Sequence, residues 1–322
     1  MTCAAGRCIS WSYQRVAYRR LYRVPGEKNT NENNCIWDTL DLCFNLRGIG
    51  WSWSHGLQVS PRPTQSRRDF LISSLIHFFK CVILADHIHW AVQWFGPTTI
   101  GSPHGGTIHH PPLPPFLDLL RSTILISLTG LFICFILEMA YDVFALIGVG
   151  IFNQHPLQWP PLLDSPWLSS SLTELWASRW HQIFRDVFIG VGAKPLSLLV
   201  GRVGWIIGGF SVSAILHYFG LWGLGRGTEF SGVGSYFLIQ GLGVTLEHLW
   251  KSFTGRRMKG LVGRVWTFVW AIGMGQGFLD AWFLRGLAGS SLHQDRFRPS
   301  YITLGSLPLP SAWYFCFFRC PE

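Results

Sequence analysis

The sequence predicts an all-α protein that crosses a membrane several times, as a bundle of roughly six to eight helices. Of its 322 residues, 48% are hydrophobic and only 13% are charged, whereas soluble domains carry about 25% charged residues. Several stretches have close to the roughly 20 consecutive apolar residues that a bilayer requires. The 24 Phe and 17 Trp agree with this class, since aromatic rings gather at membrane interfaces.

The placement of the positive charge supports a membrane rather than a nucleic acid as the reason for the net charge of +9. No motif for stacking bases or reading a groove accompanies the basic residues. Cytosolic segments of membrane proteins are rich in Lys and Arg, so we expect both basic segments to be cytosolic and no nucleic acid to be bound. The basic residues cluster at Arg7, Arg15, Arg19, Arg20 and Arg23, and again at Lys251, Arg256, Arg257, Lys259 and Arg264.

The cysteines predict neither a disulfide framework nor a zinc site, because no two of them form a close CxxC pair. No signal peptide begins the sequence, so insertion is expected to rely on an internal span. The eight cysteines are Cys3, Cys8, Cys35, Cys43, Cys81, Cys134, Cys316 and Cys320.

The first half of the chain divides into a polar lead and two apolar spans. Residues 1–66 are expected to form a polar cytosolic lead. The first span begins at Phe70 and contains Lys80. A loop rich in Pro and Gly follows at 97–115, and residues 123–152 give the strongest span.

The second half is expected to contain an amphipathic helix and three Gly-rich spans. Ser171 and Glu174 stand at capping-box spacing at the start of the amphipathic segment, which runs to about residue 187. The expected spans are 203–224, 230–249 and 261–284, in which Gly allows close helix packing. We therefore expect a membrane domain at 67–290 and a C-terminal tail at 291–322.

Two histidines stand out as candidate chemical groups, because ionisable residues inside a bilayer are costly. His217 lies deep in an uncharged segment, with Ser213 one turn earlier on the same helical face. A structural histidine bonded across the bundle would give the same pattern. His181 lies beside Arg179 and Trp180 on the amphipathic segment, where it is either a functional group or an interfacial polar residue.

The other histidines and motifs give weaker indications of a function. His87 and His89 stand two apart, which places them on different faces of a helix and disfavours a shared metal. His109 and His110 lie in the Pro-rich loop and are expected to be solvated. The sequence contains no GxSxG, HExxH, P-loop or dinucleotide-binding motif.

Four segments, in order along the chain, resemble the wax synthase-like branch of the membrane-bound O-acyltransferases. They are LCFNLRGIGWSW (42–53), SLTELWASRWHQIF (171–184), FSVSAILH (210–217) and YFLIQGLGVTLEHLW (236–250). The resemblance extends over residues 38–285, and fungal members that acylate secondary metabolites look most similar.

The resemblance implies a catalytic tunnel in the bundle, in which an acyl group passes from coenzyme A to a hydroxyl. His217 takes the position of the family's catalytic histidine, and His181 takes a motif position occupied by Asn or His. We expect acetyl-CoA or another acyl-CoA as co-substrate, a lipophilic alcohol as acceptor, no bound cofactor or metal, and the endoplasmic reticulum membrane as location. The expected supporting residues are Trp180, Arg179, Ser213 and Glu247.

Three alternatives stay open at this point. A long-chain wax ester synthase uses the same chemistry with a different tunnel. A transporter would use Glu138, Asp142 and His217 as a polar pathway, although the internal duplication common in transporters is not visible. The third is an inactive fragment with a truncated N-terminus. Related chains carry one or two hydrophobic spans before the segment that matches FNLRGIGWSW, and this chain has the polar lead there instead.

Overall fold

A computed structural model describes residues 43–49, 51, 54, 57, 65–290 and 297–304 of the chain. These residues form helices and no strand. Three helical stretches within them are long and apolar enough to span a membrane, namely Arg67–Trp94, Pro115–Gly150 and Arg185–Trp222. The predicted all-α membrane class is confirmed, while most of the expected cytosolic lead and most of the expected tail lie outside the described residues.

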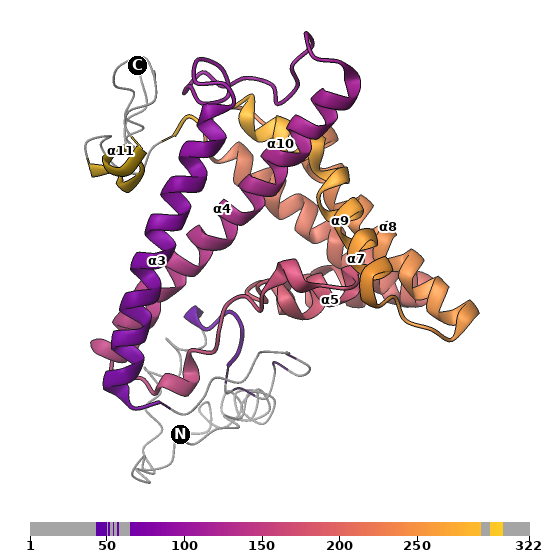
Figure 1. Ribbon diagram of the computed structural model, residues 1–322. Coiled ribbons are helices and arrows are strands. Elements are labelled where there is room, and N and C mark those ends of the chain that lie inside the picture. Colours follow the sequence, from indigo (N-terminus) through magenta and orange to yellow (C-terminus); the bar gives the residue numbers. More distant parts are fainter. Residues whose placement is uncertain are drawn as a thin grey trace.

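The first two spans form a pair of long helices, α3 (Arg67–Trp94) and α4 (Pro115–Gly150). The Ser66 side chain caps α3 by accepting a hydrogen bond from the backbone N–H of Asp69. The helix α4 begins eight residues earlier than expected, because Pro115 suits the first turn of a helix. Figure 1 shows the two helices side by side, and Phe70 packs with Ala145 and Val149 between them.

The predicted continuous amphipathic helix up to residue 187 is wrong. A helical turn α5 (Leu172–Glu174) passes into a π-helical turn η3 (Leu175–Arg179), and the backbone is then extended at Trp180 (ψ 155°). Helix resumes as α6 (Arg185–Val187) and the π-helical η4 (Phe188–Ala193). His181 therefore lies in an irregular segment between two helical pieces.

The helix α7 (Lys194–Trp222) contains a reversal that the apolar pattern did not predict. Gly201 adopts a φ of +60°, a left-handed conformation that favours glycine. The chain folds back there, so that Gly192 of η4 lies against the backbone of Gly208. A Cβ atom at Gly192 would come within 2.1 Å of the Gly208 carbonyl oxygen, so close packing of this hairpin requires glycine.

The remaining elements follow the predicted spans to different extents. The helix α8 (Phe230–Thr254) matches the expected segment. The expected span 261–284 is divided into α9 (Gly260–Ala271), a 3-10 turn η5 (Gly273–Gly275) and α10 (Gln276–Phe283). Short 3-10 turns occur in the loop before α5, η1 (Pro156–Gln158) and η2 (Pro166–Leu168), and a short helix α11 (Pro299–Leu304) lies against α3.

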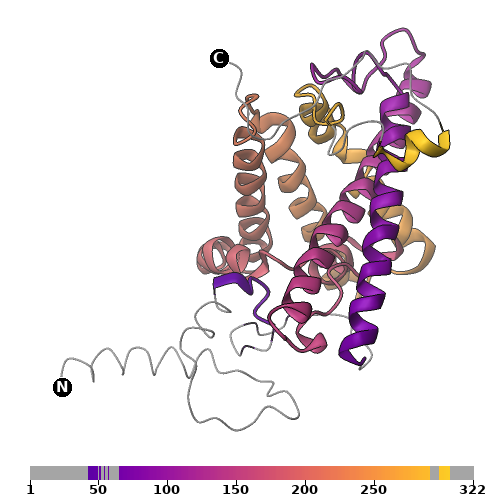
Figure 2. The same ribbon diagram turned by 90° about the vertical axis from the view of Figure 1, so that its left-hand side faces the viewer.

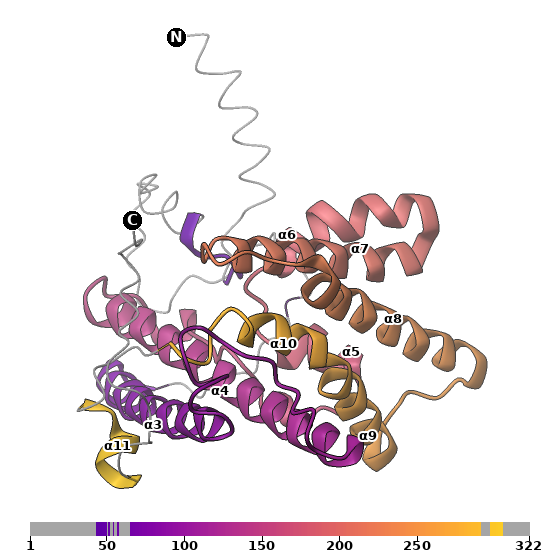
Figure 3. The same ribbon diagram turned by 90° about the horizontal axis from the view of Figure 1, so that it is seen from above.

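The helices form two groups with α10 between them. The pair α3 and α4 makes one group, and α7 and α8 pack together in the other; Figures 2 and 3 show the groups on opposite sides of the bundle. The helix α10 contacts both α8 and α4. Its Leu279 and Phe283 are buried in one core with Leu125 of α4 and Val92 of α3, so α10 also packs against the first group.

Alkaline carbonate washing is expected to leave the protein in the membrane pellet, and detergent is expected to release it. The spans α3 and α4 together expose many large apolar side chains, including Ile76, Phe79 and Phe144, which lipid would cover. Immunoblotting of pellet and supernatant checks this expectation. Recovery of the protein in the carbonate supernatant would overturn the membrane topology.

Candidate active site

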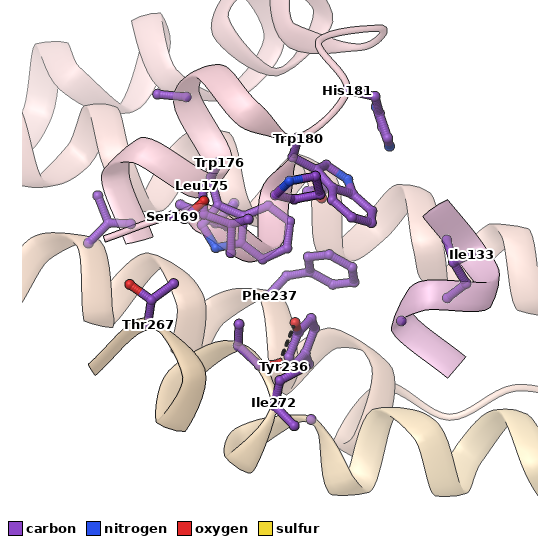
Figure 4. Close-up of a pocket in the computed structure, with 18 of the residues that line it drawn as sticks. Ile133, Ser169, Leu175, Trp176, Trp180, His181, Tyr236, Phe237, Thr267 and Ile272 are labelled. Atoms are coloured by element: carbon purple, nitrogen blue, oxygen red, sulfur yellow. Dashed lines mark hydrogen bonds between the residues drawn. The ribbon is translucent and has the colours of Figure 1, made fainter. Parts of the chain in front are cut away.

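A cavity of about 930 Å³ lies between the two groups of helices. Its walls come from α4, α7, α8, α9 and α10 and from the irregular segment around Trp180. Both candidate histidines, His181 and His217, line it. Apolar and aromatic side chains form most of the wall, and Figure 4 shows Trp176, Trp180 and Phe237 among them; the rings of Trp176 and Trp180 are in contact, with centroids 5.8 Å apart.

His217 lies on α7, and one of its ring nitrogens takes part in a hydrogen bond. Its Nδ1 lies 2.8 Å from the backbone carbonyl oxygen of Ser213. A carbonyl only accepts, so Nδ1 carries the proton and donates it, which leaves Nε2 as the acceptor of a neutral ring. The ring stacks on Phe237 of α8, with centroids 4.1 Å apart. This contact fixes the ring plane at the cavity wall.

His181 is brought to the same cavity by the break in the helix. Its Nδ1 is buried and has no hydrogen-bond partner among the described residues. Burial lowers the pKa of His181 to about 4, with smaller contributions from the charges of His217 and Arg47. The imidazole is therefore neutral near pH 7. A buried nitrogen without a hydrogen-bond partner lowers the stability of the folded protein by about 1–3 kcal/mol. Native proteins keep few such groups, and those that remain often have a functional reason.

Gln182 stabilises the break in the helix that places His181 at the cavity. Its side-chain amide donates to the carbonyl oxygens of Trp180 and Trp176, at 2.9 and 3.2 Å. Trp176 lies in the π-helical turn η3 and Trp180 directly follows it, and the amide replaces the backbone donors that a continuing helix would supply to these carbonyls. The side chain is buried. No motif in the sequence identified Gln182, since a local capping role leaves no spacing signal.

Glu247 of α8 does not line the cavity, but it holds the start of α5. Its carboxylate accepts hydrogen bonds from the backbone N–H groups of Leu172 and Thr173, at 2.6 and 2.9 Å. The Thr173 hydroxyl and the Trp266 indole N–H donate to it as well, at 2.7 and 2.9 Å. A buried carboxylate at a helix N-terminus is favourable for both charge and hydrogen bonding. Glu247 is thus the anchor of the segment that leads to His181.

Replacing Glu247 by Ala is expected to lower the thermal stability of the detergent-solubilised protein. Four donors would lose their acceptor, and each buried donor left unsatisfied costs about 1–3 kcal/mol. Glu247→Gln keeps one oxygen acceptor and is expected to be intermediate. Fluorescence-detected thermal unfolding measures both variants. A Glu247→Ala protein as stable as the wild type would contradict this anchoring role.

The other expected supporting residues, Arg179, Ser213 and Trp180, take different positions relative to the cavity. Arg179 does not line the cavity; its guanidinium pairs with Glu174 at 2.7 Å and donates to the backbone oxygen of Asp164 at 2.8 Å. Ser213 lines the cavity and contacts His217 through its backbone carbonyl. Trp180 also lines the cavity.

The segment that contains Arg47 supports the loop before α5. Arg47 is buried and donates to the carbonyl oxygens of Pro161 and Pro160, at 3.0 and 3.2 Å, and also to the Tyr141 hydroxyl of α4. Tyr141 donates in turn to Pro160. Three further arginines, Arg185, Arg202 and Arg264, line the cavity. They were missed as site residues because they come from separate elements and form no motif.

The other polar groups considered earlier lie away from this cavity. Glu138 accepts from the backbone N–H of Leu163, and Asp142 pairs with His77. Within the described residues they do not form the polar pathway with His217 that a transporter would use. His87 and His89 bond to different partners, Thr303 and the Ala288 carbonyl, and share no metal position. His109 and His110 are exposed as expected.

Residues 159–239 match the sequence model of the membrane bound O-acyl transferase family. The matched segment includes both His181 and His217 and begins at the loop that Arg47 supports.

Three fungal proteins are similar to the chain. The acetyltransferase ataH of Aspergillus terreus is 27% identical over 258 residues, which are 71% of this chain and 83% of that protein. The acetyltransferase aurG of Calcarisporium arbuscula is 29% identical, over 48% of this chain and 40% of that protein. The acetyltransferase sirH of Emericella nidulans is 24% identical, over 56% of this chain and 42% of that protein.

Proposed function

We propose that this chain, which is similar to the membrane-bound O-acyltransferases over residues 159–239, transfers an acetyl group from acetyl-CoA to a hydroxyl of a lipophilic secondary metabolite. The observation that carries the proposal is the presence of His217 and His181 at one cavity, both within the segment that matches the family. The similar fungal proteins named as acetyltransferases support acetyl as the acyl group.

In the proposed mechanism, His217 is the general base. An alcohol is a poor nucleophile until a base accepts its proton, and the hydrogen bond to the Ser213 carbonyl leaves Nε2 of His217 free to do so. The alcohol oxygen bonds to the thioester carbonyl carbon as Nε2 takes the hydroxyl proton. Collapse of the tetrahedral intermediate breaks the C–S bond, and the imidazolium returns the proton to the departing sulfur of coenzyme A.

His181 is proposed to stabilise the charge that develops on the thioester oxygen. Its unpartnered Nδ1 supports this role, because a donor that is already in place needs no reorganisation during the reaction. The depressed pKa of His181 keeps the ring neutral, so that only one of its nitrogens carries a proton. The proposal places that proton on the nitrogen that faces the reacting carbonyl.

The lining of the cavity supports a bulky acceptor alcohol. Aromatic rings offer broad apolar surfaces that suit fused-ring or extended apolar compounds; we propose a terpenoid or polyketide-type alcohol. The cationic side chains of Arg185, Arg202 and Arg264 line the same cavity and suit the phosphate groups of coenzyme A. The aromatic residues include Trp176, Trp180, Trp205, Phe210, Tyr236, Phe237, Phe278 and Trp282.

Radiolabelled acyl transfer in microsomes tests this proposal, with the endoplasmic reticulum as the proposed membrane. Microsomes that contain the protein receive labelled acetyl-CoA or labelled palmitoyl-CoA together with terpenoid and polyketide alcohols. We expect ester from acetyl-CoA at a rate well above that of microsomes containing the His217→Ala protein. Transfer from palmitoyl-CoA alone would replace the proposal by a wax ester synthase, and no transfer from either donor with any alcohol would contradict it.

A further inference from the structure

A second cluster of polar side chains lies between α3 and α4, apart from the cavity described above. His77 and Cys81 stand four residues apart on one face of α3, and Asp142 faces them from α4. His77 Nδ1 lies 2.6 Å from Asp142 Oδ2, and Cys81 Sγ lies 3.8 Å from both ring nitrogens. One ligand atom from each residue lies within 4.8 Å of the others. None of the three lines the cavity.

We propose that His77, Cys81 and Asp142 bind a zinc ion that joins α3 to α4. Imidazole nitrogen, thiolate sulfur and carboxylate oxygen are the three kinds of ligand that zinc takes, at about 2.0–2.3 Å. Ligand atoms around a tetrahedral ion then lie about 3.3–3.8 Å apart, which the sulfur–nitrogen distances match. The imidazole and carboxylate must separate slightly, and His77, whose side chain is 49% exposed, has room to move.

Charge balance favours the metal over a simple ion pair. Asp142 and Cys81 are each 2% exposed, and charges at such positions in a bilayer are costly unless they are paired. A divalent cation, one thiolate and one carboxylate sum to zero charge. A protonated His77 paired with Asp142 is also neutral, but it gives Cys81 no role. The mixed nitrogen and sulfur ligands favour zinc over magnesium or calcium.

Ser74 adds a second observation at this helix interface. It lies one turn before His77 on α3, is 3% exposed, and its hydroxyl has no hydrogen-bond partner among the described residues. Three protein ligands leave one position of a tetrahedral ion for water, and a bound water needs hydrogen-bonding partners of its own. The cluster departs from the expectation of no zinc site, which rested on Cys–Cys spacing; a site shared by two helices needs no such spacing.

Metal analysis of the purified protein tests the proposal. The full chain is expressed with zinc in the medium, carries an affinity tag without His or Cys, and is washed with a weak chelator in detergent before mass spectrometry for metals. We expect about one zinc per chain for the wild type. Cys81→Ser and Asp142→Asn are expected to lower this content at least tenfold.

The matched control is Cys134→Ser, a buried cysteine on α4 that lies outside the cluster, and it should keep the wild-type zinc content. Cobalt loading gives a second readout, since a thiolate–cobalt charge-transfer band should appear in the wild type and vanish in Cys81→Ser. Size-exclusion elution and circular dichroism identify variants that fail to fold. Wild-type protein without zinc, or zinc content unchanged by Cys81→Ser, would overturn the proposal and favour the plain His77–Asp142 ion pair.

Discussion

Replacement of His217 by Ala is expected to reduce ester formation by about 100- to 10,000-fold, the usual contribution of a general base. The protein should nevertheless remain folded in the membrane. The variant loses one hydrogen bond to a backbone carbonyl of its own helix and one stacking contact with Phe237. A hydrogen bond in a membrane bundle contributes on the order of 0.6 kcal/mol, and an aromatic pair about 0.5–1.5 kcal/mol.

His248→Ala is a suitable matched control for this experiment. His248 lies on α8, which forms part of the cavity, but its side chain does not line it. Membrane yield and initial rates with acetyl-CoA are measured for the wild type and both variants. If the His217→Ala protein forms ester at the wild-type rate, His217 is not the base and the proposed mechanism fails at its central step.

Removal of the His181 side chain is expected to lower the rate by about 100- to 1,000-fold, as for the loss of one oxyanion donor. His181→Asn should retain part of the activity, because an amide donates a hydrogen bond but is no base near neutral pH. Folding should be little affected, since the buried Nδ1 has no partner to lose. Initial rates at saturating acetyl-CoA, together with thermal unfolding, separate the two effects.

The comparison of the two His181 variants also distinguishes hydrogen-bond donation by His181 from proton transfer. Equal loss in His181→Ala and His181→Asn would assign His181 a function that an amide does not supply, such as proton transfer. Equal retention of activity in both would remove His181 from the mechanism.

The long helices were the most predictable part of the fold. A long apolar run such as that of α4 requires a helix in lipid, because each backbone polar group must find a partner within the segment. The same rule identified α3 and α8. It did not reveal the reversal at Gly201, because Gly is common in membrane helices for packing reasons as well, and periodicity does not show which glycine adopts a positive φ.

The two histidines of the candidate site were identified from the sequence, but the shape of the site was not. His217 and His181 were identified from sequence, and the cavity brings them together. The irregular segment that presents His181 was missed, because its residues have helical apolar spacing and the break depends on the Gln182 side chain. The His77–Asp142 contact was also missed, since it joins residues 65 positions apart on different helices.

The attachment of both histidines to α8 has a consequence for how a large substrate enters. Phe237 of α8 supports the His217 ring, and Glu247 of α8 anchors the segment that leads to His181. The opposite wall belongs to α4, whose Cys134 and Leu137 also pack with Trp180 beside His181. A movement of α4 that admitted a bulky alcohol would therefore disturb the packing next to His181, whereas the stacking of His217 on Phe237 involves α7 and α8 alone.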